Sequence, residues 1–337
     1  MKAAFFTTKP WEEDYLRQLL SGVSDLTLDF YPEDLRAETL PPRTDYDLIS
    51  VFVGSVVNKP VFEALPNLKC VVARSTGFDH IDLATARERN VVVSYVPSYG
   101  ENTVAEYAFA LLLALSRKIY QAFDQIKENA NFKVEDLRGF DLRGKTIGVV
   151  GTGRIGRHAI GIAKGFGMQV LGYDPFPNQA LAQELGFTYL SLPQLLAKSD
   201  VITLHVPYAK ETHHLINTET LKQMKPGAYL INTSRGAVVE TEALIPALKS
   251  GQLGGVGMDV FEEEKVIFNE ADFLARGDNE LHNWRTIIAN HVLIDLPNVI
   301  VTPHNAFNTT EAIKRILETT AENIKTFLAG NPANTVK

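Results

Sequence analysis

Short runs of β-branched and other apolar residues alternate along the chain with stretches whose apolar positions recur at helical spacing. This alternation predicts parallel β-sheet with helices on both faces, an α/β fold. No glycine-rich phosphate-binding motif occurs within residues 1–100. In that part of the chain the predicted strands are Ala3–Phe6, Leu26–Tyr31, Leu48–Val53, Cys70–Ala73 and Val91–Tyr95, and the predicted helices include Pro10–Leu20 and Lys59–Leu65.

A long helical pattern from Asn102 to Tyr120 separates this series from a second one. Its apolar residues lie nearly all round the helix, which predicts a buried helix and suits a position between two domains. The second series has predicted strands at Lys145–Val150, Val170–Tyr173, Val201–His205, Ala228–Asn232 and Gly255–Met258, with helices near Ala180–Leu185, Leu192–Lys198, Glu219–Met224 and Glu240–Ser250.

The segment Glu262–Ile294 breaks the alternation, because it is acidic at first and then irregular. We expect it to run over the surface of the protein or over a partner subunit. A last strand follows at Val299–Val301, and a helix that begins at Thr309 or Thr310 ends at Gly330.

Size and charge narrow the functional classes. A chain of 337 residues is too long for one ordinary core, so we expect two domains. A net charge of −7 and a pI near 5.7 argue against binding to nucleic acid or a membrane surface, whose phosphates would be repelled.

Cys70 is the only cysteine, which excludes an intrachain disulfide and a cysteine-based metal cluster, and no metal site is predicted. The N-terminus becomes charged too soon for a signal peptide, and the most apolar stretch, Ala105–Leu115, is too short for a membrane span; we expect a cytoplasmic protein.

A glycine fingerprint, Gly151-Thr152-Gly153-Arg154-Ile155-Gly156, follows the strand Lys145–Val150 and begins a helix. Gly151 suits a tight turn, Gly153 lets the backbone approach a pyrophosphate, and Gly156 allows close packing of helix and strand. The helix N-terminus would then stabilise the charge of the diphosphate. The motif alone is weak, because glycine-rich turns also occur for structural reasons.

The context of the fingerprint strengthens it. The next strand, Val170–Tyr173, ends in Asp174, eighteen positions after Gly156. This spacing places a carboxylate near the ribose hydroxyls of an adenine dinucleotide, where it would repel a 2′-phosphate. The sequence therefore predicts a dinucleotide-binding domain that prefers NAD to NADP. The alternative is that Asp174 is only a turn residue before Pro175.

Three further segments combine charged residues with strand ends. Arg235 follows the strand Ala228–Asn232, and a guanidinium there suits two-pronged recognition of a carboxylate. Glu262, Glu263 and Glu264 follow Gly255–Met258, and His304 follows Val299–Val301. Singly, each has an ordinary interpretation as a salt-bridge partner, a solvated acidic face or a structural histidine. Together, and downstream of a dinucleotide fingerprint, they predict a catalytic site at the end of a sheet where ligands bind.

From Ala73–Asp79 through the glycine fingerprint to Pro303-His304, the chain resembles the D-isomer-specific 2-hydroxyacid dehydrogenases, and most of all their D-lactate dehydrogenase branch. The resemblance covers essentially the whole chain. It implies that Arg235 binds the substrate carboxylate and polarises the carbonyl, that His304 is the proton donor and acceptor, and that Glu264 pairs with His304. Glu264 is preferred to Glu262 and Glu263 because the family's glutamate falls five positions after the motif aspartate, here Asp259.

The family pattern also implies contacts with the cofactor and the substrate. Asp259 would meet the nicotinamide amide, and backbone amides of Ser75, Thr76, Gly77 and Phe78 would hold the substrate carboxylate. Tyr99, Phe52 and Phe307 would line the substrate pocket. The remaining cofactor contacts implied are Gly151, Gly153, Arg154, Ile155, Gly156, Asp174, Val206, Pro207, Thr212, Thr233, Ser234 and Arg235.

The resemblance further implies a domain plan and a reaction. A discontinuous substrate domain, residues 1–100 and 300–337, would flank a cofactor domain, residues 101–299, with the active site between them and a homodimer as the assembly. The implied reaction is pyruvate + NADH + H⁺ to D-lactate + NAD⁺. Other members of the family act on 2-hydroxyisocaproate, glyoxylate or hydroxypyruvate, and the fold also serves as an NAD-sensing corepressor. Formate dehydrogenases of this fold lack the glutamate, and phosphoglycerate dehydrogenases carry an extra regulatory domain.

Overall fold

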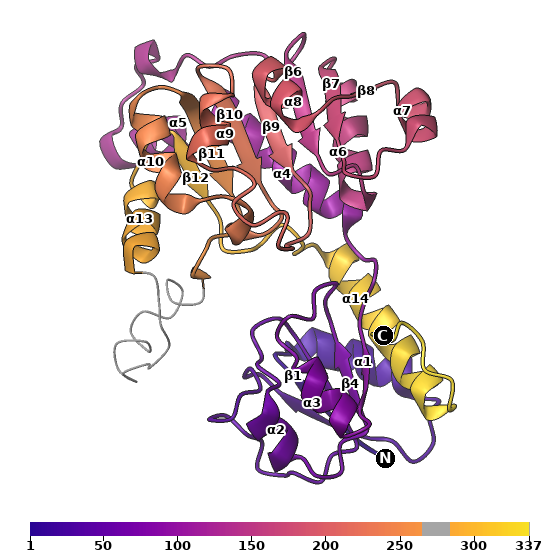
Figure 1. The fold of residues 1–337 in the computed structure, drawn as a ribbon. Helices are drawn as coiled ribbons and strands as arrows, with labels where there is room; N and C mark the ends of the chain where they lie inside the picture. Colours follow the sequence, from indigo (N-terminus) through magenta and orange to yellow (C-terminus); the bar gives the residue numbers. More distant parts are fainter. Residues whose placement is uncertain (265–283, 337) are drawn as a thin grey trace. The chain divides into compact units, whose positions relative to one another are not determined.

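A computed structural model describes residues 1–264 and 284–336 of the chain (Figure 1). The predicted α/β fold is confirmed: two parallel sheets, of five and seven strands, are each covered by helices. The chain divides into two compact units, one formed by Met1–Gly100 with Asn308–Lys337 and the other by Glu101–Phe307. Among the described residues, no helix is both long enough and apolar enough to cross a bilayer.

The smaller unit is built on a five-stranded sheet in the order β2-β1-β3-β4-β5. Side chains alternate along each strand, so Phe5 faces one core and Phe6 the other. On the Phe5 face, α1 and α14 supply the apolar partners, and α14 thereby returns the end of the chain to the N-terminal unit. Its elements are β1 (Lys2–Phe6), α1 (Pro10–Leu20), β2 (Thr27–Tyr31), β3 (Leu48–Val51), α2 (Lys59–Ala64), β4 (Cys70–Ala73), α3 (Leu83–Glu88), β5 (Val92–Ser94) and α14 (Thr310–Leu328).

The larger unit has a seven-stranded sheet in the order β12-β11-β10-β9-β6-β7-β8. Helices α4, α6 and α7 pack on one face, and α8, α9, α10 and α13 pack on the other. Its strands are β6 (Thr146–Val150), β7 (Gln169–Tyr173), β8 (Thr188–Tyr189), β9 (Val201–Leu204), β10 (Ala228–Asn232), β11 (Leu253–Met258) and β12 (Val299–Val301). Its helices are α4 (Glu101–Ser116), α5 (Ile119–Asn129), α6 (Arg154–Gly165), α7 (Gln179–Leu185), α8 (Leu192–Lys198), α9 (Thr218–Lys222), α10 (Thr241–Lys249) and α13 (Trp284–Ile294), with 3₁₀ turns at Glu135–Leu137 and Gly236–Val238.

The observed helix α4 is shorter than the helix predicted over Asn102–Tyr120. The buried part of that predicted helix is confirmed as α4, which packs on α6 and on strands of the larger sheet. The helix stops at Ser116, whose carbonyl accepts the amide of Phe140 at 2.9 Å, and Lys118 then takes a left-handed φ of 51°. Residues from Ile119 onward form the separate helix α5.

The prediction of an irregular excursion over Glu262–Ile294 is wrong for its last part. Residues Trp284–Ile294 form α13, which packs on α10 and β12; Ile287 and Leu293 are buried, and Leu293 belongs to the core on this face of the sheet. The middle of the segment, residues 265–283, lies outside the described residues. Sequence reasoning missed α13 because it directly follows the polar stretch Arg276–Asn283, although most residues of the helix are apolar.

The two units also refine the predicted domain boundaries. The smaller unit spans residues 1–100 and 308–337, so residues 300–307 belong to the larger unit. The reason is that β12 pairs with β11, with Val301 opposite Met258, and the amides of His304 and Ala306 bond to Asp259.

Candidate active site

The charged residues singled out in the larger unit come from three neighbouring strands. Arg235, Asp259 and His304 follow the carboxyl ends of β10, β11 and β12, which lie side by side and parallel at one edge of the sheet. Because parallel strands end at the same edge, these loops converge there. The convergence that the sequence predicted is therefore present in this unit.

His304 and Glu264 form a hydrogen-bonded pair, with 3.1 Å between Nδ1 of the ring and Oε1 of the carboxylate. Burial raises the pKa of Glu264, but the hydrogen bond from His304, the charge of His304, a longer bond from the amide of Phe261 and the charge of Arg235 outweigh burial, so the pKa is lowered overall. Glu264 is therefore an anion at neutral pH. A carboxylate on Nδ1 orients the ring and leaves Nε2 for proton transfer.

Arg235 is held by the turn that follows β10. The side chain of Asn232, fully buried, donates to the carbonyl of Arg235 and accepts from both the amide and the hydroxyl of Ser234. At the next position, a Cβ on Gly236 would lie 2.0 Å from the backbone carbon of Phe261. Glycine at this position thus lets the Arg235 turn pack directly against the strand end that leads to Glu264.

Asp259 holds the turn that carries His304. Its Oδ1 accepts from the hydroxyl of Thr302 at 2.5 Å and the amide of Asn305 at 2.8 Å, and its Oδ2 accepts the amide of Ala306 at 2.8 Å. Within this turn His304 has a left-handed φ of 52°. Burial raises the pKa of Asp259, against the opposing effect of these bonds. The observed role of Asp259 is to shape the turn; its contact with the nicotinamide amide stays a prediction.

The glycine fingerprint lies between β6 and α6 and fits a dinucleotide. Gly151 has a φ of 91°, and a Cβ there would lie 2.5 Å from the carbonyl oxygen of His205. A Cβ on Gly156 would lie 2.0 Å from the carbonyl oxygen of Gly151. A Cβ on Gly153 would meet nothing within 4 Å, which leaves room for a ligand. Just after β10, the next-but-one strand from β6, the buried hydroxyl of Thr233 has no hydrogen-bond partner among the described residues.

Asp174 combines the two interpretations that the sequence left open. Its Oδ2 accepts from the amide and the hydroxyl of Thr152 at 2.9 and 3.0 Å, and its Oδ1 accepts the amide of Phe176 at 2.9 Å. The carboxylate therefore ties the glycine loop to the end of β7. Each oxygen keeps further acceptor capacity, so a ribose contact is compatible with this arrangement.

The other predicted cofactor residues lie around the same loops. Thr212 accepts the amide of Ala209 and donates to the carbonyl of Pro207, both at 2.7 Å, and so closes the loop that begins at Val206. Arg154, with a side chain that is 65% exposed, lies 3.8 Å from Glu101 at the start of α4. Ile155 packs against the apolar core beneath α6. Ser234 is buried beside Asn232.

The predicted substrate residues of the smaller unit occupy a similar edge of its own sheet. Phe52, Ser75 and Tyr99 follow β3, β4 and β5, which are neighbours. Ser75 is buried and donates to the carbonyl of Gly77 at 2.6 Å, which shapes the loop whose amides were predicted to hold a carboxylate. Of the other predicted residues, Phe78 packs edge-on against Tyr95 at 5.4 Å, Thr76 is exposed, and Phe307 is the last residue of the larger unit.

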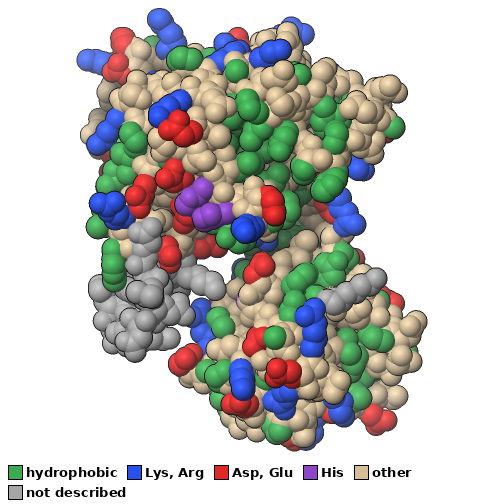
Figure 2. Space-filling view, in the orientation of Figure 1, with side chains coloured by type: hydrophobic (Ala, Val, Ile, Leu, Met, Phe, Trp, Pro, Cys, Tyr) green, Lys and Arg blue, Asp and Glu red, His purple; other side chains and the backbone are tan. Residues whose placement is uncertain are grey.

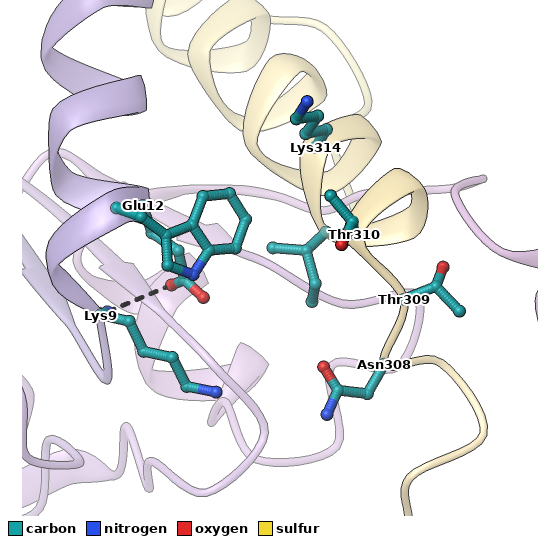
Figure 3. Close-up of a pocket in the computed structure, with 8 residues that line it drawn as sticks. Lys9, Glu12, Asn308, Thr309, Thr310 and Lys314 are labelled. Atoms are coloured by element: carbon teal, nitrogen blue, oxygen red, sulfur yellow. Dashed lines mark hydrogen bonds between the residues drawn. The ribbon is translucent and has the colours of Figure 1, made fainter.

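A separate cavity of about 410 Å³ lies in the smaller unit, between the starts of α1 and α14 (Figure 3). Figure 3 shows Glu12 and Lys9 on the α1 side and Thr310 and Lys314 on the α14 side. None of its lining residues was predicted as part of the site. Its charged lining residues are Lys9, Lys314 and Glu12, and the carboxylate of Glu12 accepts the backbone amide of Lys9.

Several residues that organise the site were missed at the sequence level. Asn232 and Thr302 act through side-chain bonds to loops, and the only signal was a polar residue at the end of a buried strand. His214 and Glu262 form a second histidine–glutamate pair, 2.7 Å apart. Histidine side chains are visible on the surface of the larger unit beside acidic and basic ones (Figure 2).

Comparison with known proteins identifies the larger unit. Residues 109–306 match the family model described as the D-isomer specific 2-hydroxyacid dehydrogenase, NAD binding domain. The chain belongs to this family. It is an NAD-dependent D-2-hydroxyacid dehydrogenase, an oxidoreductase that acts on the CH–OH group.

Three relatives illustrate the range within the family. The chain is 38% identical to D-lactate dehydrogenase of Escherichia coli over 98% of both sequences, and 37% identical to a glyoxylate reductase of Korarchaeum cryptofilum over 100% of this chain and 96% of that protein. The crystal structure of D-lactate dehydrogenase from Aquifex aeolicus complexed with NAD and lactic acid superposes with a TM-score of 0.84 at 36% identity, covering 98% and 96% of the two chains.

Proposed function

We propose that this family member is a D-lactate dehydrogenase that reduces pyruvate to D-lactate. The observation that carries the proposal is the His304–Glu264 hydrogen bond beside Arg235, at the ends of three adjacent strands. A similarity to D-lactate dehydrogenases over the whole chain supports the choice of substrate.

The proposed roles follow from charge and geometry. NADH, when bound by the glycine loop and Asp174, supplies the hydride. Arg235 binds the carboxylate of pyruvate and stabilises the negative charge that develops on the carbonyl oxygen. His304 donates its proton to that oxygen, and Glu264 stabilises the imidazolium before transfer. In lactate oxidation His304 takes the proton back.

A substrate panel tests this function. Loss of NADH absorbance is followed with pyruvate, hydroxypyruvate, glyoxylate, phenylpyruvate and 2-ketoisocaproate, and the hand of the product is determined with an enantiomer-specific assay. Highest kcat/KM on pyruvate with a D-product is the expected result. Binding of NADH without turnover of any of these acids would contradict it and favour a sensor related to the corepressors of this fold.

Glyoxylate reduction is the second candidate, because a glyoxylate reductase is nearly as similar as the D-lactate dehydrogenases. The two substrates differ by one methyl group, so discrimination by an apolar pocket is limited to about 1–3 kcal/mol. In the smaller unit, the family resemblance implies Phe52 and Tyr99 for this pocket. A kcat/KM for glyoxylate at least tenfold above that for pyruvate would replace the lactate proposal with this one.

We further propose a homodimer, as the family resemblance implies, and a cytoplasmic location. Helix α5 is a candidate surface for the second copy, because the described chain buries none of its side chains. Its apolar residues Ile119, Tyr120, Phe123 and Ile126 are each 45–60% exposed. Light scattering on the wild type and on Phe123→Glu should give a dimer and a monomer; an unchanged mass would place the interface elsewhere.

A further inference from the structure

We infer that Glu262 is a positioning residue that, together with His214, fixes the segment carrying Glu264. The inference rests on the proposed function of the His304–Glu264 pair. It concerns the first glutamate of the run Glu262–Glu264, to which the proposed reaction gives no role.

Glu262 accepts hydrogen bonds from three separate parts of the chain. Its Oε1 accepts from Nε2 of His214 at 2.7 Å, and its Oε2 accepts the amide of Thr241 at 2.9 Å, where α10 begins. The carbonyl of Glu262 accepts the side-chain amide of Asn290, in α13, at 2.8 Å. The side chain is only 15% exposed, so these bonds are sheltered from competition with water.

The bond to His214 reaches the loop between β9 and α9. The backbone of His214 is itself fixed, because its amide donates to the carbonyl of Ala237 and its carbonyl accepts from the side chain of Asn217, both at 2.9 Å. The ring stacks on His213 with 3.9 Å between centroids. Glu262 is therefore anchored to a rigid partner rather than to a mobile surface side chain.

The side chains of Glu262 and Glu264 bind different histidines. Between them, Glu263 has a left-handed φ of 56°, a conformation that costs free energy in a residue other than glycine. Glu262 bonds to His214, whereas Glu264 bonds to His304. The bonds of Glu262 hold this turn in the conformation that presents Glu264 to Nδ1 of His304.

A displacement of about 1 Å at a catalytic group can lower the rate by about a hundredfold. Loss of Glu262 should therefore reduce kcat by between about tenfold and a hundredfold, acting through Glu264. The effect must disappear once Glu264 can no longer act, which separates this role from a general loss of stability.

The first test is spectroscopic and needs no substrate. The Nδ1 proton of His304, bonded to a carboxylate, should give a downfield proton NMR signal, assigned by its absence in His304→Gln. We expect it to be lost or broadened in Glu262→Ala and His214→Gln. Glu240→Gln is the matched control, because Glu240 also accepts a backbone amide at a helix start, that of Thr218 at 2.9 Å, and should retain the signal.

The second test is a double-mutant cycle with whichever 2-keto acid the wild type turns over. Glu262→Ala should lower kcat in the wild type but change it less than twofold in a Glu264→Gln background, with the KM for NADH little changed. Glu262→Gln, which keeps an oxygen for the Thr241 amide, serves if Glu262→Ala does not fold. An unaltered NMR signal, or equal losses of kcat in both backgrounds, would overturn the inference. Absence of turnover in the wild type would count against the proposed function and leave the NMR result to decide.

Discussion

The two units place their predicted functional residues at equivalent positions, after neighbouring strands of a sheet, but the chemical types of these residues differ. In the smaller unit, Phe52, Ser75 and Tyr99 follow three neighbouring strands at one edge of the sheet; in the larger unit, Arg235, Asp259 and His304 do the same. The first set offers aromatic surface, hydroxyls and backbone amides. The second offers charges and a titratable ring. One architecture therefore supports two kinds of chemistry, and the chemistry depends on the residues placed at the strand ends.

Buried charge shows the same difference. In the smaller unit, Arg74 is the largest fully buried side chain, and it donates to the carbonyls of Phe6 and Thr7. Burial lowers its pKa to about 10. This guanidinium donates hydrogen bonds to backbone carbonyls. In the larger unit, by contrast, the carboxylate of Glu264 bonds to His304, and that of Asp259 bonds to the turn that carries His304. Substitutions in the larger unit test whether its charges carry the chemistry.

His304→Gln should have the largest effect. Removal of the proton donor is expected to lower kcat by about 10²–10⁴-fold, while NADH affinity stays nearly unchanged because the glycine loop is untouched. Stopped-flow rates and a fluorescence titration with NADH measure the two quantities. Retention of more than a tenth of the wild-type rate would remove His304 from its role.

Arg235→Lys keeps the charge but loses the planar fork. We expect the KM for the keto acid to rise about tenfold to a hundredfold, because a lysine cannot bind a carboxylate in two-pronged fashion. Steady-state kinetics at saturating NADH provide the measurement. A KM equal to that of the wild type would contradict the assignment of Arg235 as the residue that binds the substrate carboxylate.

Asp259→Asn should have an intermediate effect. An amide has only one oxygen, so it cannot accept the bonds of Thr302, Asn305 and Ala306 that the carboxylate accepts, and the His304 turn should loosen. We expect kcat to fall about tenfold and stability to fall by about 1–3 kcal/mol. Denaturant unfolding and kinetics on one sample measure both; loss of stability alone would make Asp259 purely structural.

Asp174→Ala should change cofactor selectivity more than rate. Removal of the carboxylate abolishes the repulsion of a 2′-phosphate, so the ratio of kcat/KM for NADH to that for NADPH should fall about tenfold. Thr152→Ala is a matched control, because it disturbs the bond to Asp174 without removing the charge. Equal ratios in wild type and Asp174→Ala would place the ribose contact elsewhere.

Glu264→Gln should reveal the smallest effect, on the pH dependence of stability. The pKa of Glu264 is lowered in the folded protein, so its ionised form stabilises the fold above the ordinary value of 4.5, and this contribution is lost as the pH falls through the folded-state value. The wild type should therefore exceed Glu264→Gln in stability at pH 7 and lose that advantage in acid. Urea unfolding from pH 7 to pH 3 is the measurement, and a constant difference would contradict the bond to His304.

Much of this protein could be predicted from its sequence because the signals are local. Strands such as Cys70–Ala73 and Ala228–Asn232 are short runs whose side chains are buried on both faces, and their bounds were predicted to the residue. The glycine fingerprint is equally local, because each of its glycines is required by the turn or the close backbone approach at its own position. Alternation of these strands with helices was enough to indicate two parallel sheets.

Other features depend on partners far along the chain. The end of α4 depends on the Phe140 amide reaching Ser116, and the place of β12 depends on pairing with β11. Three consecutive glutamates are equivalent by residue type, and only the fold brings His214 beside one and His304 beside another. Sequence by itself determined the elements and the chemical groups available. Tertiary structure decided which groups meet, because a hydrogen bond requires a few ångströms of proximity that no local pattern encodes.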